Sequence, residues 1–240
     1  MNAVLRIGVV GILLYASNSS RADIILVPGT SNIFAAGSAT IPFGAGDGTV
    51  PPVVSFAPGA NLVVRFSSVT GSVSADTNAA NLNGPDGGVY LGYAGTNINS
   101  AAGISGMVHA NRNMFLAGVF LDSGTPVSAP ARLGFSDPEN FTSISPLIGQ
   151  TFFIGDGLTD TGSIQQHFNV PNGANRLFLG FVDAADPIPF QGRPGFYFDN
   201  TGTLTANLSV AAIPEPNSIA LALVASVVLL NRRKNSRYMV

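Results

Sequence analysis

The sequence predicts an all-β fold: a single β-sandwich or jelly-roll-like domain, flanked by an N-terminal signal peptide and a C-terminal membrane helix. Glycine and proline occupy 28 and 16 of the 240 positions, and charged residues make up only 10%. This composition excludes long helices and coiled coils, because helix interiors tolerate neither glycine nor proline well. The apolar residues, 46% of the chain, suffice for a core and occur in short runs separated by turn residues.

The first 22 residues are expected to form a signal peptide. Arg6 supplies the positive charge, residues 7–16 form a short apolar stretch, and Ser20-Arg21-Ala22 is a small-x-small cleavage site. The stretch is too short for a permanent membrane helix. We expect signal peptidase to cut between Ala22 and Asp23, so that the domain over residues 23–213 leaves the cytoplasm.

The domain over residues 23–213 contains a series of short apolar or alternating segments bounded by turn signals. Such spacing is typical of sandwiches and jelly rolls, and no low-complexity linker divides the region. The segment 67–74 is rich in turn residues and is expected to interrupt the sheet. Strands are predicted over residues 61–66, 114–121, 150–154, 164–170, 176–182 and 203–210.

The charge of this domain excludes several functions. Five arginines face twelve carboxylates between residues 23 and 213, a net charge near −7, so a nucleic-acid binder is excluded. The absence of cysteine excludes disulfides and thiolate metal sites. His109 and His167 show no nucleophile motif, and Glu139 is the only glutamate of the domain. We therefore expect a protein that is not an enzyme.

Oxygen-bearing side chains flank two of the predicted strands. Asp183 follows the strand over 176–182, and Asp199-Asn200 precedes the last strand. If these strands pair, the side chains meet at one end of the sheet as a set of hard oxygen ligands, which suits calcium. The alternative is that Asp199-Asn200 belongs to a hairpin turn and Asp183 caps a strand end. Spacing alone favours the turn.

Two segments resemble the C-terminal half of the calcium-dependent galactophilic bacterial lectins of the PA-IL type. They are Asn172-Gly-Ala-Asn-Arg-Leu-Phe-Leu-Gly-Phe-Val-Asp183 and Pro194-Gly-Phe-Tyr-Phe-Asp-Asn-Thr-Gly-Thr-Leu204. The resemblance implies a bound Ca²⁺ whose coordination is completed by vicinal hydroxyls of a sugar. The metal ligands that it implies are Asp183, Asp199, Asn200 and the carbonyls of Phe196 and Val73.

The same resemblance implies sugar contacts from Asp183 and Asn200. It adds Asp86 as a ligand-binding residue, through the segment Gly84-Pro85-Asp86-Gly87. One aromatic ring among Phe190, Phe196 and Tyr197 is a candidate to cover the apolar face of the sugar. The identity of the sugar stays open, because the histidine and glutamine that contact galactose in the family have no counterpart at the matching points of this chain.

The C-terminal segment, residues 214–240, resembles the bacterial PEP-CTERM sorting tail. It contains Pro214-Glu215-Pro216, an apolar run over about 218–230, and the basic cluster Arg232-Arg233-Lys234. The resemblance implies a membrane helix that anchors the chain until an exosortase removes the tail. It also implies export across the inner membrane and delivery to the envelope surface or the extracellular matrix.

Three functions are compatible with these observations. The first is an exported carbohydrate-binding protein in which a bound calcium ion coordinates sugar hydroxyls. The second is a structural protein of the extracellular polysaccharide matrix with a purely structural calcium, and the third is an extracellular hydrolase. The expected partners are signal peptidase and exosortase during export, the membrane before processing, and a cell-surface or extracellular polysaccharide, but no nucleic acid.

Overall fold

A computed structural model describes residues 21–186 and 190–213 of the chain. The predicted all-β class is confirmed, because strands dominate this part and its only helices are three 3₁₀ turns of three residues. The predicted signal peptide up to residue 20 and the whole sorting tail, including the expected helix over 218–230, lie outside the described residues. Within them, no helix has the length and apolar character needed to cross a membrane.

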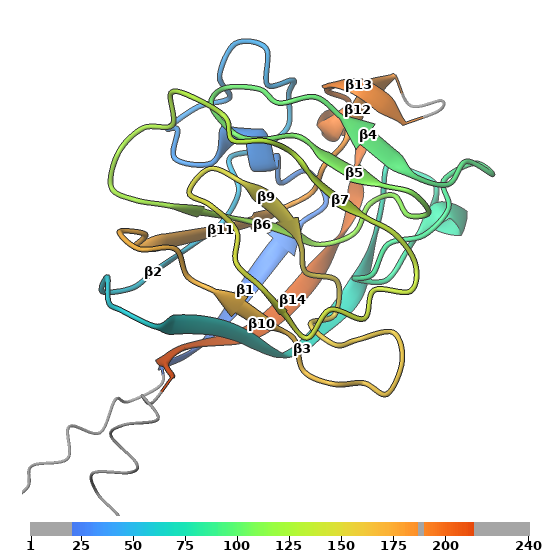
Figure 1. Ribbon diagram of the computed structural model, residues 1–240. Helices are drawn as coiled ribbons and strands as arrows, with labels where there is room; N and C mark the ends of the chain where they lie inside the picture. Colours follow the sequence, from blue (N-terminus) through green and yellow to red (C-terminus); the bar gives the residue numbers. More distant parts are fainter. Residues whose placement is uncertain (1–20, 187–189, 214–240) are drawn as a thin grey trace, which may run out of the picture.

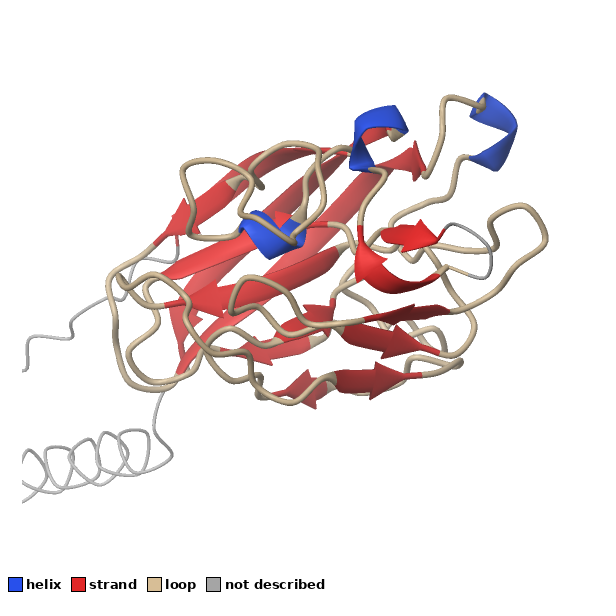
Figure 2. Cartoon of the chain, turned by 90° about the horizontal axis from the view of Figure 1, so that it is seen from above, coloured by secondary structure: helices blue, strands red, loops and turns tan. Residues whose placement is uncertain are grey.

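Most strands have five residues or fewer, and the two longest, with 13 and 12 residues, pair with each other in one sheet. The 3₁₀ turns are η1 (Ile33–Ala35), η2 (Ala79–Asn81) and η3 (Tyr197–Asp199), and they lie in connecting segments (Figure 2). The strands are β1 (Arg21–Pro28), β2 (Val53–Ser55), β3 (Leu62–Ser74), β4 (Thr96–Ile98), β5 (Met107–His109), β6 (Ala117–Leu121), β7 (Leu133–Phe135), β8 (Ser143–Ile144), β9 (Thr151–Phe153), β10 (His167–Asn169), β11 (Arg176–Gly180), β12 (Ala184–Asp186), β13 (Gln191–Pro194) and β14 (Thr201–Ala212).

The strands form three sheets in a sandwich-like arrangement (Figure 1). The first has the order β1-β14-β3-β10-β8, the second β2-β11-β6-β9, and the third β12-β13-β4-β5-β7. Phenylalanines fill the space between the first two sheets. Phe168 of β10 packs on Phe152 of β9 at a ring-centroid distance of 5.4 Å and meets Phe66 of β3 edge to face at 5.6 Å. The core therefore lies between two sheets whose strands alternate along the chain.

The predicted interruption of the sheet after residue 66 is wrong. The segment 67–74, expected to interrupt the sheet, continues β3 and pairs with β14 along its length. Val69 and Val73 face the core between serines and threonines on the outer side. Gly71, at φ 105°, packs so closely that a Cβ would lie 2.3 Å from the Thr203 carbonyl oxygen. The serines and threonines of this segment thus form the polar outer face of the strand, and Gly71 allows the close approach of β3 to β14.

The antiparallel pair β1–β14 runs from one end of the sandwich to the other. Arg21 pairs with Val210, so the first and last described residues lie together (Figure 1). Pro28 pairs with Thr203 at the other end, which we call the distal end. The expected cleavage point between Ala22 and Asp23 lies within β1. The segments that precede β12 and β14 both reach the distal end, where the candidate site lies.

Candidate functional site

The structure brings Asp183 close to Asp199 and Asn200, although not by the expected strand pairing. Strand β11 belongs to the second sheet and β14 to the first, so the two strands do not pair. Their ends meet across the sandwich through Tyr197, whose buried hydroxyl accepts from the Asp183 N–H at 3.0 Å and donates to the Phe181 carbonyl at 3.2 Å. The condition that these strands pair is therefore not met, because apolar patterning does not specify which sheet a strand joins.

Asp183 is the most deeply buried carboxylate of the site, with 1% of its surface exposed. Its Oδ1 accepts from the Ala184 N–H at 2.7 Å, whereas its Oδ2 has no hydrogen-bond partner. Burial raises the pKa of Asp183 to about 8; the Asn200 side chain and the Ala184 N–H oppose this rise, and the charges of Asp199 and Asp47 add to it. A carboxylate in this position needs a proton or a cation to compensate its charge.

Asp199 and Asn200 each contribute a further unpaired oxygen. The Asn200 amide donates to the Gly29 carbonyl at 3.0 Å, which leaves its own Oδ1 without a donor. Asp199 Oδ1 is likewise buried and unpaired, and burial together with the charges of Asp47 and Asp76 raises the pKa of this carboxyl group. Three acceptor oxygens without donors therefore lie in one region, an arrangement that buried polar atoms rarely adopt without a water or an ion.

The chemistry of these oxygens fits a hard cation. Carboxylate and amide oxygens are the ligands that calcium takes in proteins, and a bound ion would satisfy acceptors that no donor reaches. No set of three or more His, Cys, Asp or Glu side chains in residues 21–186 and 190–213 is arranged to hold a metal. The two carboxylates would therefore need the Asn200 oxygen and main-chain carbonyls to complete the coordination.

Asp47 is a site residue that the sequence interpretation missed. Its Oδ1 accepts from the Phe198 N–H at 3.2 Å, and its charge raises the pKa of both Asp183 and Asp199. It comes from the loop between η1 and β2, far from the other site residues in sequence. The only local signal was an aspartate between two glycines in Gly44-Ala-Gly-Asp-Gly48, which sequence reasoning treats as a turn.

Two features hold the Asp47 loop against the site. Gly48, at φ 89°, lies so close to Tyr197 that a Cβ would come within 2.5 Å of the tyrosine Cβ. The fully buried amide of Asn32 donates to the main-chain oxygens of Ala45 and Asp47, both at 2.8 Å. The position of Asp47 is therefore set by tight backbone packing and by one buried side chain.

The remaining predicted metal ligands differ in their surroundings. Phe196 precedes η3 in the left-handed region at φ 64°, and its side chain is 40% exposed. Val73 is buried on β3, and its carbonyl already accepts from the Asn83 N–H at 2.7 Å. Of the aromatic residues considered as a sugar platform, Phe190 and Tyr197 are fully buried, so Phe196 alone offers an exposed ring.

Asp86 belongs to a different cluster. Its carboxylate accepts from the Asp156 N–H at 2.8 Å. Burial raises its pKa, and the charges that act on it are those of Asp156, Arg112 and Asp160 rather than those of the candidate site. The structure thus groups Asp183, Asp199 and Asn200 with Asp47, and places Asp86 with the residues around Arg112.

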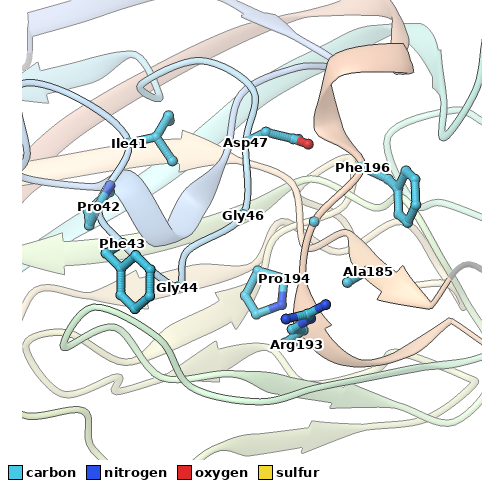
Figure 3. Close-up of a pocket in the computed structure, with 11 residues that line it drawn as sticks. Ile41, Pro42, Phe43, Gly44, Gly46, Asp47, Ala185, Arg193, Pro194 and Phe196 are labelled. Atoms are coloured by element: carbon cyan, nitrogen blue, oxygen red, sulfur yellow. The ribbon is translucent and has the colours of Figure 1, made fainter.

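The residues Asp47, Asp183, Asp199 and Asn200 are called the acidic group below. An open cavity of about 510 Å³ adjoins this group at Asp47. One wall is the loop from Ile41 to Asp47, and the other is formed by Ala185 and by Arg193 to Phe196 (Figure 3). Asp47 belongs to both the cavity and the acidic group, so it connects the buried oxygens with solvent. The site therefore consists of a buried oxygen cluster with a pocket beside it.

Comparison of the chain with protein-family models, with curated proteins and with solved structures finds no match. Its function is therefore inferred from the geometry and chemistry of this site.

Proposed function

We propose that the chain is an exported, non-enzymatic carbohydrate-binding protein with a lectin-like β-sandwich domain that holds a calcium ion. The main support is the set of unpaired buried oxygens of Asp183, Asp199 and Asn200 beside an open cavity. A cation at this point would compensate a carboxylate that burial otherwise keeps protonated near neutral pH.

The burial of each residue indicates the side from which it would coordinate the ion. Asp183 and Asn200, 1% and 5% exposed, would hold the ion from the inside, and the half-buried Asp199 and Asp47 would face solvent. The carbonyls of Phe196 and Val73 remain candidate ligands. When bound, the ion supplies positive charge and coordination positions that adjacent sugar hydroxyls can fill. The exposed Phe196 ring would cover an apolar sugar face.

The location forms part of the same proposal. Signal peptidase would cut after Ala22, and the tail beginning at Pro214-Glu215-Pro216 would anchor the chain transiently until an exosortase releases it. The domain would then act at the envelope surface or in the extracellular polysaccharide. Many copies on one surface would compensate for the weak binding of single sugars, because linked sites gain avidity without new contacts.

Calcium binding tests the metal part of this proposal. The full-length chain in detergent is titrated with calcium by calorimetry, and its thermal unfolding is followed with calcium and with a chelator. Saturating calcium should raise the midpoint by about 5–10 °C, as expected for ligand at roughly 100 times its Kd. Asp183→Asn should abolish both the heat and the shift.

Asp122→Asn serves as the matched control, because Asp122 caps an exposed turn through the Gly124 N–H and lies outside the site. This variant should bind calcium as the wild type does. Absence of heat and of stabilisation in the wild-type chain would rule out the calcium site.

A structural role for the ion is the second candidate, and the burial of Asp183 and Asn200 favours it. An ion enclosed by these residues would join the 41–48 loop to the segment that precedes β14 without contacting carbohydrate. Binding to immobilised polysaccharides, with calcium and with a chelator, separates the two roles. Calcium-dependent stabilisation without any polysaccharide binding would identify the structural role.

A further inference from the structure

We infer that the cavity between the 41–47 loop and residues 193–196 binds an acidic sugar, a uronate unit of a polysaccharide, and that Arg193 recognises its carboxylate. This inference rests on the proposed function, because it names the class of carbohydrate that the same region would take. It draws on the size of the cavity, on two exposed aromatic rings, and on an arginine without a protein partner.

The cavity has the size and construction of a small-ligand site. Its volume of about 510 Å³ falls within the roughly 300–1,000 Å³ of typical ligand pockets. One wall is held by the Asn32 amide and the other by the β12–β13 pairing, in which Ala184 lies opposite Pro194. The Gly195 N–H also donates to the Asp183 carbonyl at 3.3 Å. Both walls are therefore positioned by hydrogen bonds.

Two phenylalanine rings lie at the rims of the cavity. Phe43 is fully exposed, and Phe196 is 40% exposed with its ring 6.0 Å from that of Phe198. Figure 3 shows Arg193 and Pro194 between the rings of Phe43 and Phe196. Exposed rings grouped around a cavity are typical of binding surfaces, and a pyranose ring offers apolar C–H faces that match them.

Arg193 differs from the three arginines of the domain whose guanidinium groups have hydrogen-bond or ion-pair partners. Arg65 has none among the described residues either, but it is half-buried on β3 and does not line the cavity. Arg112 pairs with Asp137 and Asp160, Arg132 donates to Asn97 and Ile98, and Arg176 donates to main-chain oxygens of the turn at Asp122. Arg193 is exposed and forms no hydrogen bond or ion pair with any described residue. Its planar guanidinium is thus available for a ligand, and its geometry matches a carboxylate in a two-point contact.

A bound ion would weaken the repulsion between the acidic wall of the cavity and an anion. Asp47 lies on the wall opposite Arg193 (Figure 3). In a domain with a net charge near −7, this aspartate would repel an acidic sugar in the metal-free state. A divalent cation held by the oxygens of Asp183, Asp199 and Asn200 would reduce that repulsion. A uronate would then meet Arg193 on one wall and the open coordination positions of the ion on the other, whereas a neutral sugar would leave Arg193 without a charged partner.

The test compares an acidic oligosaccharide with its neutral counterpart. The full-length chain in detergent is titrated, in calcium, with a tetrasaccharide of alternating glucuronate and N-acetylglucosamine and with the same tetrasaccharide after reduction of its carboxylates to alcohols. The acidic form should bind about tenfold more tightly or better. Arg193→Gln should remove this preference, and Arg193→Lys should retain part of it.

Arg65→Gln is the matched control, since Arg65 lies on β3 away from the cavity and should not alter the preference. Equal affinity for both tetrasaccharides, or an unchanged preference in Arg193→Gln, would overturn the inference. If the neutral form binds equally well and the chelator abolishes binding, the proposed function stands and only the acidic specificity fails. If the acidic preference depends on Arg193 but not on calcium, the recognition stands and the metal proposal fails.

Discussion

Asn32 shows how a single buried side chain positions an acidic group of the site. Its amide donates to the oxygens of Ala45 and Asp47, and its own Oδ1 accepts from the Phe34 N–H at 2.9 Å. All the hydrogen-bonding capacity of this side chain on the loop side is used to hold main chain rather than to contact a ligand. Asn32 is therefore a positioning residue, and its replacement should affect Asp47 without removing any ligand atom.

Asn32→Asp should destabilise the protein by about 2–4 kcal/mol, because an acceptor then faces two carbonyl oxygens that lose their donors. Calcium affinity should fall as well, since the loop that carries Asp47 is released. Urea unfolding and calcium titration measure the two effects. Asn169→Asp is the control, because the hydroxyls of Ser143 and Ser145 can donate to the new carboxylate. Equal losses in the two variants would contradict the role given to Asn32.

The histidine and the glutamate that a hydrolase would use are enclosed in the core. His109 and Glu139 are 1% and 4% exposed, and Nε2 of the histidine lies 3.4 Å from Oε1 of the glutamate. Burial, assisted by the charge of Arg112, lowers the pKa of His109 to about 4, although Asp137 and Asp160 act in the opposite direction. Burial raises the pKa of Glu139 to about 6. Neither group lines the cavity.

These shifts predict a defined response to acid. The unfolded chain protonates His109 near its ordinary pKa of 6.5, whereas the folded chain resists protonation until about pH 4. Stability from this group is therefore lost as the pH falls from about 7 to 4, by up to about 3 kcal/mol. Glu139 acts oppositely, since its raised pKa makes the folded state gain stability as the pH falls from about 6 to 4.5.

The His109 contribution is isolated by His109→Gln, which should lower the difference in unfolding free energy between pH 7 and pH 4 by about 2–3 kcal/mol. His167→Gln, at a half-buried position on β10, should change that difference less. Urea unfolding at the two pH values gives both numbers. A pH dependence that does not change in His109→Gln would show that the buried histidine does not resist protonation.

At the scale of elements, the 41–48 loop depends on glycines that are not equivalent. Gly44 and Gly48 both have positive φ, at 81° and 89°. A Cβ on Gly44 would meet nothing within 4 Å, whereas one on Gly48 would lie 2.5 Å from the Tyr197 Cβ and 2.6 Å from the Thr30 oxygen. Gly44 is thus needed for backbone conformation alone, whereas Gly48 is needed also for close packing, as is Gly46, where a Cβ would lie 2.9 Å from Gly195 Cα.

Gly48→Ala should therefore cost more than Gly44→Ala. Both substitutions place a side chain in the left-handed region, at about 1 kcal/mol, and only Gly48→Ala adds a collision that moves the loop away from Tyr197. We expect an additional loss of about 1–3 kcal/mol in urea unfolding. Calcium affinity should decrease in the Gly48 variant and persist in the Gly44 variant. The same loss in both would show that the loop does not press on Tyr197.

Individual strands were predictable where apolar residues follow one another, as in β9 and β11, or alternate with polar ones, as in β14. The second half of β3 was not, because serines, threonines and Gly71 obscure the buried Val69 and Val73. The proximity of Asp183 to Asp199 was predicted only on condition that their strands pair, whereas packing across two sheets achieves it. The position of Asp47 in the site could not be predicted. It is set by the Asn32 hydrogen bonds and the Gly48 contact, and neither produces a periodic pattern in the sequence.

At the scale of the whole molecule, the register of β1 against β14 relates the ends of the described chain to the site. The pairing starts where Arg21 meets Val210 and ends where Pro28 meets Thr203, next to Gly29 and Asn200. The site therefore lies at the opposite end of the molecule from Ala212, two residues before the start of the proposed sorting tail at Pro214. The expected cut after Ala22 would leave the ladder from Asp23 to Pro28 in place.

The length of β14 sets the distance between the pocket and the point at which the chain would be tethered. The twelve residues of β14 extend about 40 Å at roughly 3.3 Å per residue. In a molecule tethered through the residue after Ala212, β14 would lead from the tethering point to the distal end, and β1 would run antiparallel beside it. The pocket would then open on the side facing away from the tethering surface, at about the length of β14 from it.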